Sequence, residues 1–507
     1  MTNYRNNRNK ADKKVFEETF DYKNLELNFQ NIQAIIGSNA DFISKSIFIM
    51  NNRNIEASII FMDGLVNIQL ISDYVVKPLM QANIFETCDS EADAINIIDQ
   101  GTVYYLNNKK RTDINDVLND ILTGSIAVLF NKQQIAFTFE TKGFDKRTIS
   151  EPRVENSIKG AKDSFVENIR VNTATCRLKI KSPNLTIEET IVGKQSKTTI
   201  AICYMKNIVN EKLLVEVKKR LDNIEVDNVI TAGYLEEFII DNKFSAFPQI
   251  QYTERPDKFC TSLLDGRVGL ILDGMPVSYI IPGTIIQFLQ APEDFSENYL
   301  MSSTIRSIRF ASMFVTLILP AFFVSITNFH QEMIPTELTF SIIAAKEGVP
   351  FPMFVEVILM LAAFELLVEA GLRLPQTIGQ TISIVGALVV GQSAVEAKLL
   401  SPVTVIIIAI TAIAGFVMPN LDFSNALRIW RFLFVIFSCI VGIYGLTIGL
   451  ILLLYSWCKM DSFGIPYLSP FVGGEEEQLQ DTLFRLPLYT MKYRPAGLRV
   501  KNKRRLL

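Results

Sequence analysis

The sequence FASMFVTLILPAFFVSITN (310–328) decides the fold, because the whole run carries no charged side chain. As a helix it is long enough to cross the ~30 Å hydrocarbon core of a bilayer. Pro320 lies in mid-span, where a helical bundle tolerates the kink. Arg306 and Arg309 precede the run and place its start on the cytoplasmic side by the positive-inside rule. The run predicts that the C-terminal part of the chain is an all-α bundle of transmembrane helices.

Further apolar runs predict how often the chain crosses the membrane. The segment 485–507 holds eight Lys or Arg and no acidic residue, so both ends of the bundle are expected on the cytoplasmic side. This requires an even number of crossings, and six remains possible if a weaker segment also crosses. Arg428 and Arg431 would fall on the outer side of a four-span bundle, which conflicts mildly with the rule. The three further strong spans are 381–400, 402–419 and 432–457.

A fifth run, FVEVILMLAAFELLVEAGL (354–372), is apolar but carries Glu356, Glu365 and Glu369. Each carboxylate in a span costs about 2.5–3.5 kcal/mol on insertion scales. We therefore interpret this run as interfacial, re-entrant or buried inside an oligomer. Glu365, Glu369 and Arg373 share one stripe at i, i+4 spacing, with each Glu before the Arg, which is the favourable order.

The residues before the bundle predict an α/β soluble region made of two mixed α/β subdomains. SIFIMNN and EASIIFMDG read as paired strands, and SIAVLF with QQIAFTFE reads as a second hairpin. TCRLKIKS alternates with period two and also predicts a strand, whereas NEKLLVEVKKRLDNI has the period of an amphipathic helix. No long internal repeat is evident. The expected parts are a mobile polar arm (1–24), a first domain (25–140), a linker (141–165), a second domain (166–300), a membrane domain (306–458) and a basic cytoplasmic tail (459–507).

Composition excludes several classes of function. Lys and Arg total 50 against 53 Asp and Glu, so no basic excess points to nucleic acid. The six cysteines form no C-x-x-C pair, and His330 is the only histidine in the sequence, which argues against a metal site or a histidine-dependent triad. We therefore expect no enzyme, no cofactor and no metal, and no signal peptide is visible at the N-terminus. The basic tail is expected to lie against anionic lipid headgroups or to dock a partner.

Several long blocks resemble one known family. They are RPDKFCTSLLDGRVGLILDGMP (255–276), PEDFSENYL (292–300), RSIRF (306–310), NFHQEMIPTELTFSIIAAKEGVPFP (328–352) and the stretch from 364 to 420. In this order they are similar to the A subunit of GerA-type spore germination proteins. The resemblance covers roughly residues 170–480.

The resemblance implies a multi-pass subunit of a nutrient germinant receptor in the inner membrane of a bacterial spore. Its soluble domains and tail would face the spore core. Relatives of this type act with a transporter-like B subunit and a lipoprotein C subunit, and the A subunit is thought to form a homo-oligomeric channel for monovalent cations. A paralogue that works with dipicolinic-acid release proteins would look similar.

A channel needs a helix that can face water at membrane depth, and the best candidate is 381–400. One face would line the pore, with Glu396 and Gln392 at a negative mouth and Leu388 and Val385 as a hydrophobic gate. The opposite, small-residue face is an alternative lining, and a structural role in which Glu396 pairs with Lys398 or Arg373 is a third reading. The first face is Thr381, Val385, Leu388, Gln392 and Glu396; the second is Ser383, Ala387, Val390 and Ala394.

Two other functions compete with the channel. A secondary transporter would need inverted repeats and broken helices around a midplane site, which the expected spans do not offer. A scaffold that only positions a ligand-binding partner subunit would need no pore at all.

Overall fold

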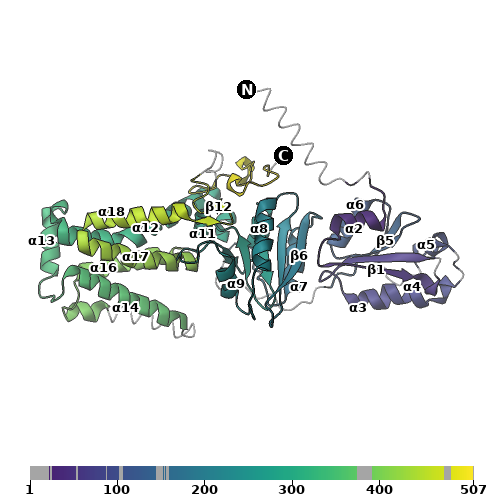
Figure 1. Ribbon diagram of the computed structural model, residues 1–507, viewed down its shortest axis with the longest axis horizontal. Helices are drawn as coiled ribbons and strands as arrows, with labels where there is room; N and C mark the ends of the chain where they lie inside the picture. The colour runs from purple at the N-terminus through teal and green to yellow at the C-terminus, as the bar shows by residue number, and fades with distance from the viewer. Residues whose placement is uncertain are drawn as a thin grey trace, which may run out of the picture.

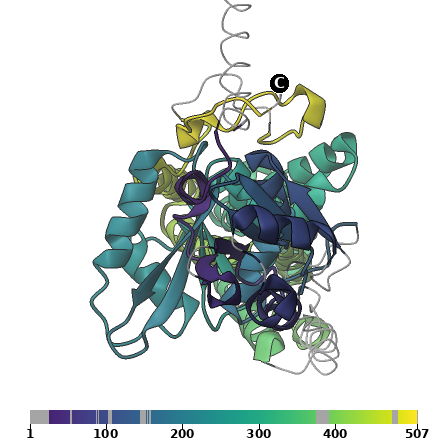
Figure 2. The same cartoon turned by 90° about the vertical axis from the view of Figure 1, so that its right-hand side faces the viewer.

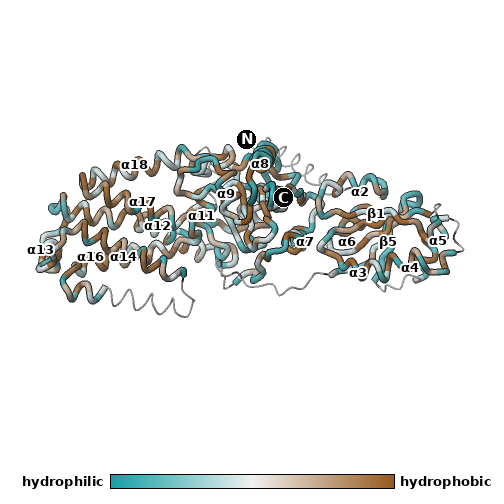
Figure 3. Tube along the Cα trace, turned by 60° about the horizontal axis from the view of Figure 1, so that its bottom comes forward, coloured by the Kyte–Doolittle hydropathy of each residue, from teal (hydrophilic) through white to brown (hydrophobic). Residues whose placement is uncertain are grey.

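The computed structural model describes Tyr22, 25–52, 55–86, 88, 90–101, 107–143, 152, 155, 159–373, 391–472 and 481–505. Two α/β domains and a helical bundle lie in a row along the long axis of the molecule (Figure 1). The apolar residues concentrate in the bundle at one end (Figure 3). The predicted fold class, a two-part α/β region followed by a helical bundle, is confirmed.

The first domain is an antiparallel sheet covered by helices on both faces. Ile60, Met62 and Leu129 pack under α2 (Phe29–Ile36) and α6 (Ile114–Leu122). The alternate residues Ile59 and Val128 face α3 (Ile68–Ile71), α4 (Lys77–Gln81) and α5 (Glu91–Asp99). The strands lie in the order β1 (Phe42–Phe48), β2 (Glu56–Met62), β4 (Ile126–Phe130), β5 (Ile135–Phe139) and β3 (Asn108–Arg111), and both predicted hairpins are confirmed.

The second domain repeats this arrangement. Its helices are α7 (Ile169–Lys179) and α10 (Pro256–Leu264) on one face, and α8 (Glu211–Asp222) and α9 (Ala232–Ile239) on the other. All neighbouring strands are again antiparallel. The strand order is β6 (Leu185–Val192), β7 (Thr198–Met205), β9 (Val268–Leu272), β10 (Ser278–Ile281) and β8 (Gln251–Thr253).

The two domains are a structural repeat, which the sequence reading missed. The order of helices and strands along the chain is the same in both domains. Equivalent positions also carry the same kinds of residue, a helix-capping Asn and a Gly with positive φ. Asn67 caps α3 and Asn210 caps α8, each directly after the second strand of its domain. Gly124 and Gly266 both have φ near +100° (93° and 100°) in the turn before the fourth strand.

The repeat also explains one wrong prediction. TCRLKIKS (175–182) is not a strand: most of it belongs to α7, the counterpart of α2. Asn168 starts this helix by accepting hydrogen bonds from the backbone N–H groups of Arg170 and Val171. The period-two signal arose because Cys176 and Ile180 face the core of the second domain at helical spacing, while Leu178 between them packs against the core of the first domain.

A buried ion pair joins the two domains. Arg177 of α7 donates to both carboxylate oxygens of Asp41, at 2.8 and 2.9 Å, and to Asn39 at 2.8 Å. Arg177 is fully buried, and Asp41 is 1% exposed in its side chain. The backbone of Ala40 and of Ile187 adds a further hydrogen bond across the joint. Bidentate geometry of this kind fixes orientation.

The second domain continues along the chain into the helical bundle, whose first helix is α12 (Tyr299–Phe329). Its other described helices are α13 (Thr336–Ala345), α14 (Met353–Arg373), α16 (Pro402–Phe416), α17 (Leu421–Val441) and α18 (Ile443–Lys459). Among the described residues, α12 and α17 are long and apolar enough to cross a membrane. Many large apolar side chains of the bundle face outward, among them Ile429, Ile436, Ile440, Tyr444, Ile451, Leu454 and Tyr455.

The predicted span 432–457 is wrong as a single helix. The chain turns at Gly442, whose φ of 64° and ψ of −135° end α17 and begin α18, so the apolar run is divided between two helices packed side by side. The predicted span 402–419 corresponds to α16, a shorter helix. Residues 391–396 are helical and the chain turns at Lys398, whereas 381–390 lie outside the described residues.

The described residues of the tail fold over the second domain (Figure 2). Tyr467, Leu498 and Val500 are buried there, beside the small sheet formed by β11 (Asp461–Ser462) and β12 (Ile465–Pro466). Arg494 donates to the carbonyl of Leu264, and Arg505 pairs with Asp265.

Candidate functional site

The predicted pore helix is described only at its C-terminal end. Thr381, Val385 and Leu388, and on the alternative face Ser383, Ala387 and Val390, lie outside the described residues. Gln392 and Glu396 are exposed, and Gln392 Nε2 donates to Glu396 Oε1 at 2.9 Å. Ala394, from the alternative face, is half-buried. The hydrogen bond that Glu396 accepts therefore comes from its own face of the helix.

The predicted charge stripe on α14 is divided. Glu369 accepts two hydrogen bonds from Arg373, at 2.6 and 2.8 Å, and both side chains are exposed. Glu365 instead turns to α17, where it pairs with buried Arg431 and lies 3.6 Å from Arg428. The two arginines that conflicted with the charge rule thus neutralise a carboxylate inside the bundle.

Glu356 lies where α14 meets the start of α16. Its carboxylate is buried and accepts hydrogen bonds from Ser401 N at 2.8 Å and Thr404 Oγ1 at 3.2 Å. These groups begin α16, and a helix N-terminus favours negative charge. α14 packs against α12, α16 and α17. The interfacial, re-entrant and oligomer-buried interpretations of 354–372 stay predictions.

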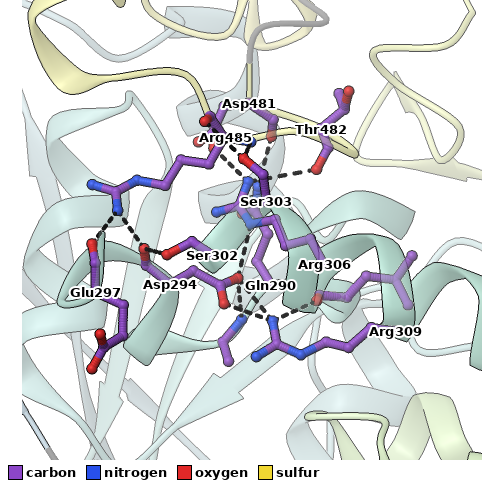
Figure 4. A network of polar contacts seen from close by, with 12 residues as sticks. Gln290, Asp294, Glu297, Ser302, Ser303, Arg306, Arg309, Asp481, Thr482 and Arg485 are labelled. Carbon is purple, nitrogen blue, oxygen red and sulfur yellow. Dashed lines mark hydrogen bonds and ion pairs between the residues drawn. The ribbon is translucent and has the colours of Figure 1, made fainter. Parts of the chain in front are cut away.

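A network around Asp294 joins the second domain to the bundle and to the tail (Figure 4). Asp294 closes the short η4 turn (Pro292–Phe295) and is 2% exposed. Arg306 Nε donates to it at 2.9 Å, and Arg309 Nη1 donates to both of its oxygens at 2.7 and 2.9 Å. One carboxylate thus holds two arginines on successive turns of α12.

The tail enters the same network. Arg306 Nη1 donates to Asp481 at 2.6 Å, and Arg485 Nη1 donates to the carbonyls of Asp294 and Glu297 at 2.6 and 3.0 Å. The Arg306 and Arg485 guanidinium groups also lie over the Phe295 ring. Burial raises the pKa of Asp481, and Arg306 opposes that shift. Any displacement of α12 along its axis must break these contacts.

An aromatic seam lies beside this network. Phe247 and Phe288 of the second domain contact Phe423, with ring centroids 5.7 and 6.0 Å apart, and Phe247 also meets Trp457 of α18 at 5.4 Å. Aromatic pairs at these distances stabilise a contact beyond the area they bury. The start of α17 and the end of α18 are therefore fixed to the second domain as well.

Sequence reasoning missed this junction. Arg306 and Arg309 were interpreted only as markers of topology, although they recur on one face of α12 and pair with a carboxylate. The available signal was the closeness of PEDFSENYL (292–300) to RSIRF (306–310), two of the most specific blocks in the chain.

Comparison with known proteins gives the family. A family model described as Bacillus/Clostridium GerA spore germination protein matches residues 30–497. The chain belongs to the GerA family. It is 37% identical to Spore germination protein KA of Bacillus subtilis, over 94% of this chain and 87% of that protein. It is 33% identical to Spore germination protein GerLA of Bacillus cereus, over 94% and 96% of the two chains.

One solved structure of the family also matches this member. The N-terminal domain of the A subunit of the Bacillus megaterium spore germinant receptor GerK3 is 29% identical, with a TM-score of 0.42, and covers 52% of this chain and 99% of that one. The family model and the relatives confirm, at the level of the family, the resemblance stated from the sequence blocks.

Proposed function

We propose that this GerA-family chain is the A-type subunit of a germinant receptor and that copies of it enclose a membrane passage for monovalent cations. The proposed location is the spore inner membrane, with the two α/β domains and the tail on the core side. A transporter-like B subunit and a lipoprotein C subunit are the proposed partners. The proposal rests on the names of the relatives and on the arrangement of charge in the bundle.

The observation that carries the proposal is where polar pairs stay exposed. Glu356 accepts hydrogen bonds from Ser401 and Thr404, and Glu365 pairs with Arg431, so both carboxylates have partners within the protomer. Glu369–Arg373 and Gln392–Glu396 are different, because both pairs are hydrogen-bonded yet exposed. They flank residues 374–390 on either side. A segment bounded by exposed polar pairs suits the wall of a water-filled passage shared between copies.

The rest of the molecule could carry a signal to that wall. The Arg177–Asp41 joint makes the two α/β domains one unit, and the Asp294 network fixes that unit to α12. α12 packs directly against α14, and the last turns of α14 carry Glu369 and Arg373. A partner that turns the soluble region therefore acts on the helix that borders the proposed passage.

Ion flux from proteoliposomes tests the function. The purified chain, reconstituted with and without partner subunits, should release K⁺ or Na⁺ down a gradient. Glu396→Gln should lower the preference for cations over anions several-fold, since a negative mouth concentrates cations. Glu332→Gln is the matched control, because Glu332 is exposed in the η5 turn (Gln331–Met333) and outside the proposed lining.

A scaffold is the second candidate, and the contacts of Glu356 with Ser401 and of Glu365 with Arg431 favour it. These contacts place both carboxylates against partners in the same chain. A scaffold predicts liposomes that stay sealed with every combination of subunits and nutrients. That result would rule out the channel while leaving the receptor assignment intact.

A further inference from the structure

A cavity of about 400 Å³ lies between the second domain and the tail. One side is formed by α10, the short helix α11 (Ile285–Leu289) and the η4 turn, and the other by tail residues from 469–470 and 481–505. This volume is within the range of small-molecule sites in proteins. The cavity is distinct from the proposed ion passage, because its lining includes neither the Glu369–Arg373 pair nor the Gln392–Glu396 pair.

The charges around the cavity do not cancel. Lys258 pairs with Glu155, Asp257 pairs with Arg255, Arg505 pairs with Asp265, and Asp481 pairs with Arg306. Two further lining arginines, Arg267 and Arg494, are 8% and 9% exposed. Their hydrogen bonds go to neutral oxygens, so each leaves a buried positive charge without its own carboxylate among the described residues.

The partners of these two arginines are carbonyls and a hydroxyl. Arg267 donates to the carbonyl of Pro282 and to Thr284 Oγ1, and Arg494 donates to the carbonyls of Leu264, Asn502 and Arg504. Burial lowers the pKa of Arg267 to about 10, and Asp265 opposes the shift. Arg267 therefore stays charged at neutral pH, and a buried cation of this kind favours an anionic ligand.

Two buried amides complete the polar lining. Gln251 is fully buried and Gln287 is 7% exposed, and in the described part of the chain the side-chain oxygen of each lacks a hydrogen-bond partner. Buried polar atoms are normally satisfied, so unpartnered acceptors in the wall of a cavity point to a ligand that donates hydrogen bonds. Ile286, Phe295 and Leu498 supply apolar lining beside them.

We propose that this cavity binds a small organic anion, with a carboxylate or phosphate head near Arg267 and Arg494 and an apolar body that also carries a donor group. The ligand would bridge the tail and the second domain. Its effect would reach the bundle, because the lining residues Asp481 and Phe295 both contact Arg306 of α12. This inference goes beyond ion passage and assigns the chain a regulatory site of its own.

Equilibrium dialysis of the full chain in lipid nanodiscs tests the proposal, with empty nanodiscs as background. The probes share one ring and differ in charge: 4-hydroxybenzoate, phenyl phosphate, benzylamine and benzyl alcohol. Either anion should be retained at least about tenfold more strongly than the amine and the alcohol. Preference for the benzoate or for the phosphate identifies the head group.

Two variants locate the site. Arg494→Gln should weaken anion binding by about tenfold, whereas Arg499→Gln, an exposed tail arginine outside the lining, should leave it unchanged. Thr261→Trp places a large ring at the cavity rim from an exposed position of α10 and should abolish binding without touching either arginine. Retention of neither anion, equal retention of benzylamine, or equal losses in Arg494→Gln and Arg499→Gln would overturn the proposal. Ion flux is not measured, so this outcome is separate from that of the channel.

Discussion

The two α/β domains share one fold but differ in what is attached to them. In the first domain the glycine before the fourth strand, Gly124, lies beside Leu65 and Lys142 of the same domain. At the equivalent Gly266, the tail residue Val500 comes within 2.2 Å of where a Cβ would be. The second domain also continues from β10 into α11 and α12. The same α/β fold thus occurs twice, and it is the second domain that continues directly into the helical bundle.

The largest effect is expected from a mutation that breaks the Asp294 network, which connects the second domain to α12. Asp294→Ala leaves Arg306 and Arg309 buried with their shared carboxylate removed, and breaking a buried ion pair costs about 3–5 kcal/mol. We expect a lower thermal midpoint of the full chain and faster proteolysis of the tail. Glu297→Ala is the control, because Glu297 accepts the Arg485 hydrogen bond through its backbone carbonyl, which the mutation leaves in place. Equal midpoints for the two variants would contradict the network's role.

A somewhat smaller effect is expected at the joint between the copies. Asp41→Ala removes the bidentate partner of Arg177, which keeps Asn39 and the carbonyl of Leu185. We expect a loss of roughly 3 kcal/mol, with the first domain unfolding separately from the second. Asp63→Ala, at the half-exposed pair with Arg170, is the control. A single unchanged unfolding transition in calorimetry would show that the joint is not needed.

A pH effect is expected at α9, in the second copy. Burial raises the pKa of Glu236 from its ordinary value of 4.5 to about 7, and the Asp422 carboxylate adds to the shift. Because the folded-state pKa is the higher one, the folded state loses stability as pH rises from about 4.5 to 7. Relative to Glu236→Gln, the wild type should lose on the order of 2 kcal/mol, less than the full shift because the side chain is partly exposed.

Thermal midpoints of Glu236→Gln and wild type across this window check the sign. The exposed neighbour Glu237, mutated to Gln, should give a much smaller change. A wild type that gains stability relative to Glu236→Gln as pH rises would contradict the assignment.

The smallest effect compares the two helix caps. Asn67→Ala and Asn210→Ala each remove a side-chain acceptor at a helix N-terminus, which costs about 1 kcal/mol. Asn210 also donates to the carbonyl of Leu498, so its loss should loosen the tail as well. Hydrogen exchange should show equal fraying of α3 and α8 but increased exchange around Leu498 only in Asn210→Ala. Serine at either position restores the cap and serves as the control.

The parts that depend on local pattern were predictable from the sequence. The hairpins, the amphipathic helix α8 and the long apolar helix α12 follow from hydrophobic period and length alone. The repeat was not visible because equivalent core positions carry different apolar residues, such as Ile126 and Val268 or Phe130 and Leu272. The break at Gly442 was missed because an apolar run looks continuous whether or not it turns.

The candidate site was predicted less well, because its contacts join distant segments. Nothing in the periodicity of 354–372 indicates that Glu365 meets Arg431. Local pattern likewise does not indicate that Arg306 joins Asp294 to Asp481. The basic tail was likewise interpreted by its charge alone, whereas Arg494 and Arg505 find partners in the second domain. The number of charged residues in a segment predicts that the segment is solvated. Which partner each charged side chain meets depends on the three-dimensional fold.

The central claim is that several copies of the chain turn the exposed pairs Glu369–Arg373 and Gln392–Glu396 towards one aqueous passage. The most direct measurement is electron cryo-microscopy of the purified protein in lipid, viewed down its symmetry axis. The account predicts a closed ring in which Gln392 and Glu396 surround a central opening. A single protomer with both side chains in a dry seam between helices, and no opening, would contradict it.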